Sequence, residues 1–309
     1  MTRWAIIYNP VAGHYRQRTM EAIERQLHGQ GITTVTIPTA YAGHATEIAR
    51  GLPSVDCVAV YGGDGTLNEV VNGLAAHKSA HRGPAKQGLP LAFLPGGTAN
   101  VMAHELGLPR DPVLALGMLL RGEPRPVRPG RVGGRLFLLM AGFGFDGAAV
   151  YGVSPAVKRW SGKGAYVWSG LRALMAAKPV LRVTESDGPQ RSGAWVVAAR
   201  AGHYGGQWRI HPRAGLMRER LGLTVVGSWG LLPFLAGNLG MGLARAGPRI
   251  WLDDRTRLVV ESSTPFHVQV DGDYFGSDTK FQVDLADVTI PLCFPGRPPT
   301  RNNAGKPHP

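Results

Sequence analysis

The first part of the chain, residues 1–124, repeats one arrangement: a short apolar run, then a turn rich in glycine or asparagine, then a segment with helical spacing. The turns are "NPVAG" (Asn9 to Gly13), "GGDGT" (Gly62 to Thr66) and "PGGTAN" (Pro95 to Asn100). Strands that alternate with helices predict a parallel sheet, and ligands of such sheets bind where the strands end. We therefore expect the three turns to meet at one edge of an α/β sheet.

The pattern changes after "RGEPRPVRPGRVGGR" (Arg121 to Arg135), which we interpret as a linker rich in proline, glycine and arginine. Many short β-branched segments follow, and their density predicts an antiparallel sandwich or barrel. A helix is expected over 163–178. The stretch 221–244 has no charged residue, but its six glycines and its proline favour a strand and a loose helix over a membrane span. The candidate strands are "RLFLLMAG", "VLRVTES", "AWVVAAR", "LGLTVV", "RLVVES", "FHVQV", "FQVDL" and "VTIPLCF".

The length of 309 residues suggests two domains, each large enough to bury a core. We predict an α/β fold: a three-layer α/β nucleotide-binding domain at 1–124 and a second, mostly antiparallel β-sandwich domain at 125–294. A final strand near 288–294 could return to the first domain. Residues 295–309 are rich in proline and asparagine, contain no acid, and are interpreted as a disordered tail.

The charge favours an anionic partner, since 34 Lys and Arg residues face 21 Asp and Glu residues. Nucleic acid, an acidic membrane surface and a phosphorylated substrate remain open on charge alone. The basic residues are scattered rather than interleaved with aromatic ones, which argues against nucleic acid. Cys57 and Cys293 lack metal-ligand spacing and are interpreted as reduced thiols of a cytoplasmic protein.

The glycine turn at 62–66 joins an expected strand to an expected helix. Its backbone N–H groups are not covered by side chains, so they can bind a phosphate group. Asp64 would repel bare phosphate, so it suggests a divalent cation between the two. The alternative is a tight turn in which Asp64 caps a helix. A GxxxxGK[ST] string is absent from the sequence, which excludes a Walker-type phosphate loop.

These motifs occur in an order that resembles the diacylglycerol kinase catalytic family, which includes bacterial lipid kinases and sphingosine kinases. The resemblance covers Ile6 to Phe294, nearly the whole chain. NAD kinases and phosphofructokinases share GGDGT, whereas the GTAN, GFGFD and late DGD segments are more specific to lipid kinases. The matching segments are "NPVAG", Thr39 with Gly43-His44-Ala45, "GGDGTLNEVVNGL", "LPGGTANVMAHELGLP", "GFGFDG" and "VQVDGD".

The resemblance implies an active site between the domains, with ATP on the α/β side and a lipid hydroxyl on the β side. It assigns Asp64 to magnesium and phosphate, possibly through water, and places the proton acceptor at Asp271 or Asp273. A carboxylate within hydrogen-bond reach of the hydroxyl could take its proton. The ATP-binding positions carried over are Asn9, Pro10, Gly13, Thr39, Gly62, Gly63, Asp64, Gly65, Thr66, Leu67, Asn68 and Thr98.

Three departures from the family pattern affect these assignments. Val101 stands where the family commonly has an acid after GTAN, and Arg218-Glu219 stands where an Asp-Gly carries a second metal site in some relatives, so we assign no such site. Asp273 replaces a glutamate, and its shorter reach could move the proton-accepting role to Asp271.

Several local patterns have two readings. The Asp-Gly-Asp segment at 271–273 could be a plain hairpin turn. Asp146 could be a turn residue or an acid behind the site. The segment 203–212 has two histidines, but we prefer a glycine-rich loop at the lipid entrance to a metal site. The basic residues around Trp160 could contact a membrane, or they could belong to an ordinary amphipathic helix packed on the sheet.

The leading hypothesis is a magnesium- and ATP-dependent kinase of a lipid alcohol, cytoplasmic and peripheral to the membrane, with a homodimer possible. One alternative is a kinase of a soluble substrate, as in NAD kinases. The other is a basic lipid- or anion-binding relative with weakened catalysis, supported by the net charge and by Val101 and Arg218 in place of acids.

Overall fold

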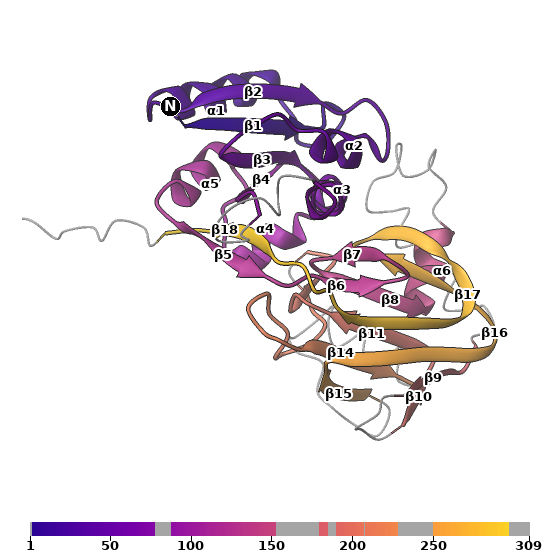
Figure 1. The fold of residues 1–309 in the computed structure, drawn as a ribbon. Coiled ribbons are helices and arrows are strands. Elements are labelled where there is room, and N and C mark those ends of the chain that lie inside the picture. Colours follow the sequence, from indigo (N-terminus) through magenta and orange to yellow (C-terminus); the bar gives the residue numbers. More distant parts are fainter. Residues whose placement is uncertain are drawn as a thin grey trace, which may run out of the picture.

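Two β-sheets dominate the molecule, and Figure 1 shows the N-terminal sheet with its helices above the larger C-terminal one. The structure is a computed structural model that describes residues 2–77, 88–152, 179–184, 190–206, 208–227 and 250–296. The expected fold class is confirmed: a sheet with mostly parallel strands is followed by a large antiparallel sheet.

The first sheet has six strands in the order β2-β1-β3-β4-β18-β5, and all neighbours are parallel except β18 and β5. Its strands are β1 (Arg3–Tyr8), β2 (Thr33–Pro38), β3 (Cys57–Gly62), β4 (Leu91–Pro95), β5 (Glu123–Val127) and β18 (Ile290–Phe294). Its helices are α1 (Gln17–His28), α2 (His44–Arg50), α3 (Asp64–Ala75), α4 (Val101–Leu106) and α5 (Pro112–Leu119).

Local sequence explains these elements. α1 buries Met20, Ile23 and Leu27, the face expected from their spacing. α5 begins with Pro112 after Asp111, whose carboxylate accepts hydrogen bonds from two backbone N–H groups of the first turn. Gly73 lets α3 lie close to α2, since a Cβ there would stand 2.5 Å from the carbonyl oxygen of Thr46.

The predicted linker at 121–135 is wrong in part, because it contains β5, the short strand β6 of the second sheet and the first residue of β7. β5 has prolines at 124 and 126, which cannot donate ladder hydrogen bonds. The strand lies at the edge of the first sheet and pairs with β18, so one side of it needs no donors. Proline content alone was therefore a poor guide here.

The second sheet is antiparallel, and its main path runs β15-β14-β11-β8-β16-β17-β6-β7, with β9 paired to β16 and β10 paired to β9. The helix α6 (Phe145–Tyr151), which the sequence analysis did not predict, follows β8, and a separate hairpin is formed by β12 (His203–Tyr204) and β13 (Trp208–Arg209). The strands are β6 (Gly130–Val132), β7 (Arg135–Phe137), β8 (Met140–Gly144), β9 (Leu181–Thr184), β10 (Arg191–Gly193), β11 (Trp195–Ala199), β14 (Leu221–Val226), β15 (Ile250–Arg255), β16 (Arg257–Val270) and β17 (Asp273–Leu285).

Two strand predictions need correction. "RLFLLMAG" was expected as one strand but is split into β7 and β8, because the backbone N–H groups of Leu138, Leu139 and Met140 donate to Asp271. "RLVVES" and "FHVQV" were expected as two strands but form the single strand β16, which carries register shifts where it pairs with β17. Both predictions were wrong because the strand boundaries depend on pairing with other segments of the chain, which the local sequence does not show.

The predicted helix at 163–178, the basic segment around Trp160 and most of the tail lie outside the described residues, as does the predicted helical part of 221–244. Among the residues described, no helix is long and apolar enough to span a bilayer. The first sheet takes strands from residues up to Val127 and from β18, and the second sheet uses Gly130 to Leu285. The division into an ATP-binding and a lipid-binding domain stays a prediction.

Candidate active site

The three glycine turns meet at one edge of the first sheet, as the sequence predicted. The backbone N–H of Asn9 donates to the carbonyl oxygen of Tyr61 at 3.1 Å, and that of His14 donates to Gly96 at 2.9 Å. The N–H of Gly96 donates to Gly62 at 2.7 Å. The turns after β1, β3 and β4 therefore support one another directly.

One of the glycines is required by the contact between turns, and a second makes a tight contact. A Cβ on Gly97 would lie 2.5 Å from the Cα of Gly63, and one on Gly13 would lie 3.0 Å from the hydroxyl of Thr98. Cβ atoms do not normally approach other heavy atoms within 3.0 Å. The bare backbone thus allows the turns to pack on each other as well as leaving their N–H groups accessible.

A cavity of about 1540 Å³ opens at this edge and is lined by residues of both sheets. Gly62, Asp64, Leu67 and Asp271, four of the predicted site residues, are not part of its lining. Leu67 belongs to the hydrophobic core instead. The predicted residues that do line the cavity are Asn9, Pro10, Gly13, Thr39, Gly63, Gly65, Thr66, Asn68, Thr98 and Asp273.

Asp64 caps a helix other than the one it begins. Its carboxylate oxygens accept hydrogen bonds from the backbone N–H groups of Val101 at 2.9 Å and Met102 at 3.0 Å, at the start of α4. Burial raises the pKa of Asp64, and these N–H groups oppose the shift. The acid in GGDGT therefore has a structural role, and its predicted role toward magnesium stays a prediction.

Asp271 is a buried carboxylate at the turn between β16 and β17. It accepts from the backbone N–H groups of Leu138, Leu139 and Met140 and from the amide of Asn68, at 2.8–3.0 Å. Burial raises the pKa of Asp271 to about 6, against these stabilising donors. Asp271 and Gly272 have φ of 49° and 89°, as a two-residue hairpin turn requires.

Asp273 lies in a different environment, facing the cavity. A Cβ on Gly65 would lie 3.3 Å from its Oδ2, so the acid of the second sheet reaches the GGDGT turn of the first. The guanidinium Nη2 of Arg135 lies 3.4 Å from the same oxygen. The structure thus separates the two acids that the sequence left equivalent.

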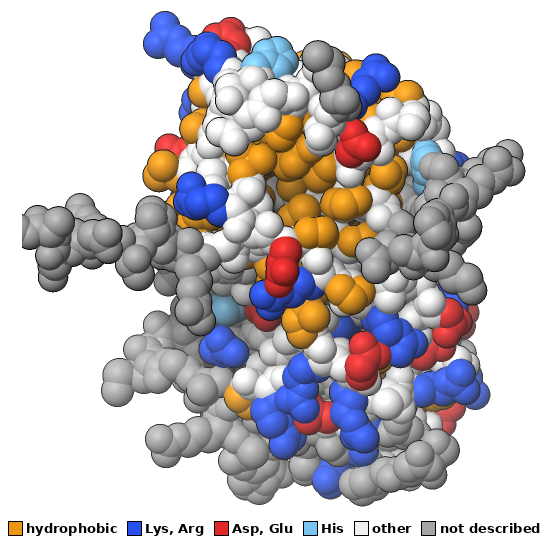
Figure 2. All heavy atoms as spheres, turned by 60° about the vertical axis from the view of Figure 1, so that its left-hand side comes forward, with side chains coloured by type: hydrophobic (Ala, Val, Ile, Leu, Met, Phe, Trp, Pro, Cys, Tyr) orange, Lys and Arg blue, Asp and Glu red, His pale blue; other side chains and the backbone are white. Residues whose placement is uncertain are grey.

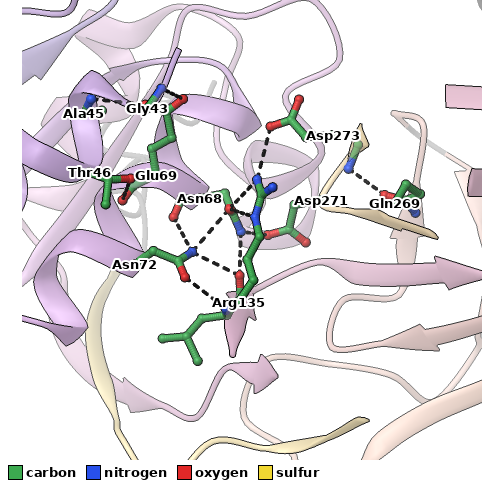
Figure 3. Close-up of polar contacts among 12 residues, drawn as sticks. Gly43, Ala45, Thr46, Asn68, Glu69, Asn72, Arg135, Gln269, Asp271 and Asp273 are labelled. Atoms are coloured by element: carbon green, nitrogen blue, oxygen red, sulfur yellow. Dashed lines mark hydrogen bonds and ion pairs between the residues drawn. The ribbon is translucent and has the colours of Figure 1, made fainter. Parts of the chain in front are cut away.

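Asn68 and Arg135 join the two sheets beside these acids (Figure 3). Asn68 is buried in α3 and donates to Asp271 and to the carbonyl oxygen of Leu136, while its own oxygen accepts from Arg135 at 3.0 Å and 3.2 Å. Asn72, one turn later in α3, accepts from the N–H of Leu136. The i, i+4 spacing of the two asparagines places them on one face of α3, and the sequence analysis missed Asn72.

Arg135 and Glu69 were missed by the sequence analysis, although both line the cavity. Glu69 accepts from the N–H groups of Gly43 and Ala45 and so holds the start of α2 beside α3. Arg135 lies in a hairpin that was interpreted as a linker, and nothing in the local pattern pointed to its partners. Figure 3 shows Arg135 between Asn68 and Asp273.

The two histidines of 203–212 have different surroundings. His203 pairs with Glu105 at 2.7 Å and His211 is buried, and within the described part of the chain no three His, Cys, Asp or Glu residues could hold a metal ion. Near Arg218-Glu219, the carbonyl oxygens of Leu216, Arg218 and Arg220 accept from the buried guanidinium of Arg200. Burial lowers the pKa of Arg200 to about 10.

Asp146 is also buried, in the first turn of α6. It accepts from the hydroxyl of Tyr204 at 2.5 Å and from the amide of Gln269 at 2.7 Å. Burial raises the pKa of Asp146, and hydrogen bonds from Tyr204, Gln269 and Trp195 oppose the shift. Asp146 is therefore a buried, hydrogen-bonded acid in the first turn of a helix, and its role behind the site stays a prediction.

Comparison with known proteins adds to this geometry. Residues 3–132 match the model of the diacylglycerol kinase catalytic domain. The chain is 30% identical to the diacylglycerol kinase of Bacillus subtilis (strain 168), over 89% of this chain and 91% of that protein. It is also 30% identical to the diacylglycerol kinase of Staphylococcus saprophyticus, over 89% of this chain and 90% of that protein.

The fold is shared with solved structures. A putative diacylglycerol kinase from Bacillus anthracis str. Sterne has a TM-score of 0.76 and 24% identity, with 94% of this chain and 97% of that chain covered. A second structure from that organism, described as a diacylglycerol kinase, has a TM-score of 0.72. The structural likeness bears on the fold, and the sequence identity over most of both chains bears on the family. This chain belongs to the diacylglycerol kinase family, which makes it a lipid kinase.

Proposed function

We propose that the chain transfers the γ-phosphate of ATP to the hydroxyl of diacylglycerol or a related lipid alcohol, in the cavity between the two sheets. The observation that carries this proposal is the contact of Asp273 with the GGDGT turn at Gly65. It brings a carboxylate of the second sheet to the turn that the resemblance assigns to the phosphates, within one cavity.

The glycine turns supply the backbone donors for the phosphates in this proposal. Gly63, Gly65 and Thr66 line the cavity at the start of α3, where the helix dipole favours negative charge. Asn9, Thr39 and Thr98 lie in the same cavity and are assigned to the rest of the nucleotide. Most of the catalysis then comes from positioning and charge stabilisation.

Asp273 is the proton acceptor in this proposal. The lipid oxygen forms a bond to the γ-phosphorus, its proton passes to Asp273, and the bond from that phosphorus to the bridging oxygen of ADP breaks. Asp271 is poorly suited, because four donors already bind its two oxygens and it does not line the cavity. Arg135, 3.4 Å from Asp273, places positive charge where the phosphoryl group transfers.

The carboxylates here fit a magnesium ion held mainly by the triphosphate. Magnesium in kinases commonly has one or two carboxylates besides phosphate oxygens and water. Asp64 accepts one hydrogen bond at each oxygen from α4, which leaves lone pairs for a bound water, and Asp273 faces the cavity across Gly65. Asp64 would hold the ion through that water, and the ion would neutralise phosphate charge.

The lipid partner implies contact with a membrane surface, and we propose a peripheral, cytoplasmic protein. Figure 2 shows one face on which Lys and Arg side chains gather over the second sheet with acidic side chains among them. Ion pairs such as Arg128–Glu219 and Arg218–Asp254 are part of this sheet's surface. Such mixing does not suit nucleic acid, which favours a basic stripe. A homodimer stays a prediction.

A phosphate-partitioning assay tests the proposal. Purified protein is incubated with magnesium and ATP labelled at the γ-phosphate, together with diacylglycerol in mixed micelles. The label is expected in the organic phase, and the Asp273→Asn variant is expected to lose it. Label in a water-soluble product would favour the soluble-substrate alternative. No transfer to any lipid alcohol, with ATP still bound, would favour a binding protein without catalysis.

A further inference from the structure

The GFGFDG motif has no part in the proposed chemistry, yet it contains one of the buried acids of the molecule. Asp146 is 3% exposed and lies in α6, which packs against β16. The hydroxyl of Tyr204 and the amide nitrogen of Gln269 donate to its two oxygens. An ionised carboxylate only accepts hydrogen bonds, so both partners must present donors.

This requirement orients the side chain of Gln269. Its amide nitrogen faces Asp146 at 2.7 Å, so its oxygen faces the other way and accepts from the backbone N–H of Gly272 at 2.7 Å. Figure 3 shows that second contact, at the turn between Asp271 and Asp273. Gly142 leaves room for the arrangement, because a Cβ there would overlap the Asp146 carboxylate.

The turn needs such a support. Asp271 is a non-glycine residue with φ of 49°, a conformation that costs free energy unless the surroundings hold it. Gln269 lies at a register shift between β16 and β17, where the regular ladder is interrupted. The Gln269 hydrogen bond therefore fixes the backbone N–H of Gly272 in the turn, one residue before Asp273 and close to this interruption.

We propose that Asp146 is a positioning residue, which acts through Gln269 and the N–H of Gly272 to hold Asp273 at the GGDGT turn. This inference rests on the proposed role of Asp273. Asp146 itself does not line the cavity, and its chain of contacts reaches the cavity at the Asp273 turn.

The test reverses the donor and acceptor roles in the hydrogen bonds that run from Asp146 through Gln269 to the N–H of Gly272. In Asp146→Asn, one acceptor oxygen becomes an amide nitrogen. With the Tyr204 hydroxyl still donating to the remaining oxygen, this nitrogen faces Gln269. Gln269 must then turn its own amide nitrogen toward the N–H of Gly272. Adding Gln269→Glu restores an acceptor there, since the new amide can donate to one carboxylate oxygen and Gly272 to the other. Total charge is the same as in the wild type.

We expect Asp146→Asn to lower kcat roughly 10- to 100-fold, as misplacement of a reacting group by about 1 Å does, with KM for ATP within about twofold. The double variant is expected to recover to within about fivefold of the wild type. Tyr204→Phe is the matched control: it removes the other donor to Asp146 but leaves Gln269 in place, so kcat should stay within about threefold.

The outcomes are distinguishable. A wild-type kcat for Asp146→Asn overturns the proposal, as does a folded double variant that is no more active than the single one. If Asp146→Asn fails to fold, the kcat of the double variant is compared with that of the wild type. A folded double variant that does not reach within about fivefold of the wild type then overturns the proposal. The Asp273→Asn variant, measured alongside, tests the proposed function itself. In the Asp273→Asn background, adding Asp146→Asn should not lower kcat any further. An unchanged kcat for Asp273→Asn alone would instead rule out the proton-acceptor role of Asp273.

Discussion

The two acids of the hairpin turn differ in how their carboxylates are used. Asp271 binds four donors and is 7% exposed, whereas Asp273 faces the cavity beside Arg135. A saturated carboxylate holds backbone in place, and an accessible one can exchange a proton with substrate. Two residues that a sequence motif presents as a pair therefore have separate tasks.

Replacement of the accessible acid is the first prediction. Asp273→Asn should lower kcat by about 10²- to 10⁴-fold, the range typical of a lost general base, because the amide cannot accept the hydroxyl proton. The unfolding midpoint should change little, since the side chain is partly exposed. Steady-state kinetics with the lipid substrate and urea unfolding measure the two effects. A variant with full kcat would contradict the assignment.

The buried acid predicts a pH dependence of stability. The folded-state pKa of Asp271 is about 6, above the value of about 3.9 in unfolded chains. The folded state therefore binds this proton more tightly. The stabilising contribution is fully present below about pH 4 and is lost as the pH rises through about 6, and the difference corresponds to roughly 3 kcal/mol.

Urea unfolding from pH 4 to pH 7 checks this sign. The free energy of unfolding of the wild type minus that of Asp271→Asn should fall as the pH rises across this window. The subtraction removes other titrating groups that the two proteins share. A difference that stays flat, or that rises with pH, would show that the backbone donors outweigh burial at this carboxylate.

Among the structural elements, the glycine turns depend on one another more than on the helices that follow them. Gly97 of the turn after β4 lies against Gly63 of the turn after β3, backbone against backbone. Asp64 of the second turn also caps α4, which follows the third. A change in one turn must therefore be transmitted to its neighbour and to the cavity that both line.

Gly97→Ala tests this dependence. Its Cβ would lie 2.5 Å from the Cα of Gly63, so the turns must separate, and we expect a loss of about 1–3 kcal/mol in the free energy of unfolding. Nucleotide affinity should fall as well, measured by isothermal titration calorimetry. The matched control is Gly117→Ala in α5, where the nearest atom is the flexible end of Gln26, and helix propensity favours a gain of about 0.5–1 kcal/mol. Equal behaviour of the two variants would exclude the packing explanation.

For the whole molecule, Asn68 is a buried link between the two sheets. From α3 it reaches Leu136 at the end of the β6–β7 hairpin, Asp271 on the hairpin of β16 and β17, and the guanidinium of Arg135. These partners lie 67 or more residues away along the chain. The active-site geometry thus depends on how the sheets are held together.

Asn68→Ala should therefore weaken the whole structure. It removes one of the four donors to Asp271 and one of the two donors to the Leu136 carbonyl in the interior, and a hydrogen bond to a charged group contributes about 1.5–3 kcal/mol. We expect a loss of roughly 3 kcal/mol in urea unfolding, together with lower kcat. Gln30→Ala, at an exposed position after α1, should change stability by less than about 0.5 kcal/mol. A variant as stable as this control would show that the sheets are joined elsewhere.

The sequence by itself determined the parts of this protein that depend on local pattern. Apolar runs followed by glycine turns and helical spacing specify parallel strands whose ends converge, and Asp271-Gly272 specifies a hairpin. The meeting of the three turns was predictable for this reason. Only the tertiary structure decided which acid faces the cavity, that Asp64 caps α4, and that Arg135 and Gln269 reach the turn around Asp273. Those outcomes depend on side-chain directions and on contacts between segments far apart in the chain, and no local spacing encodes either.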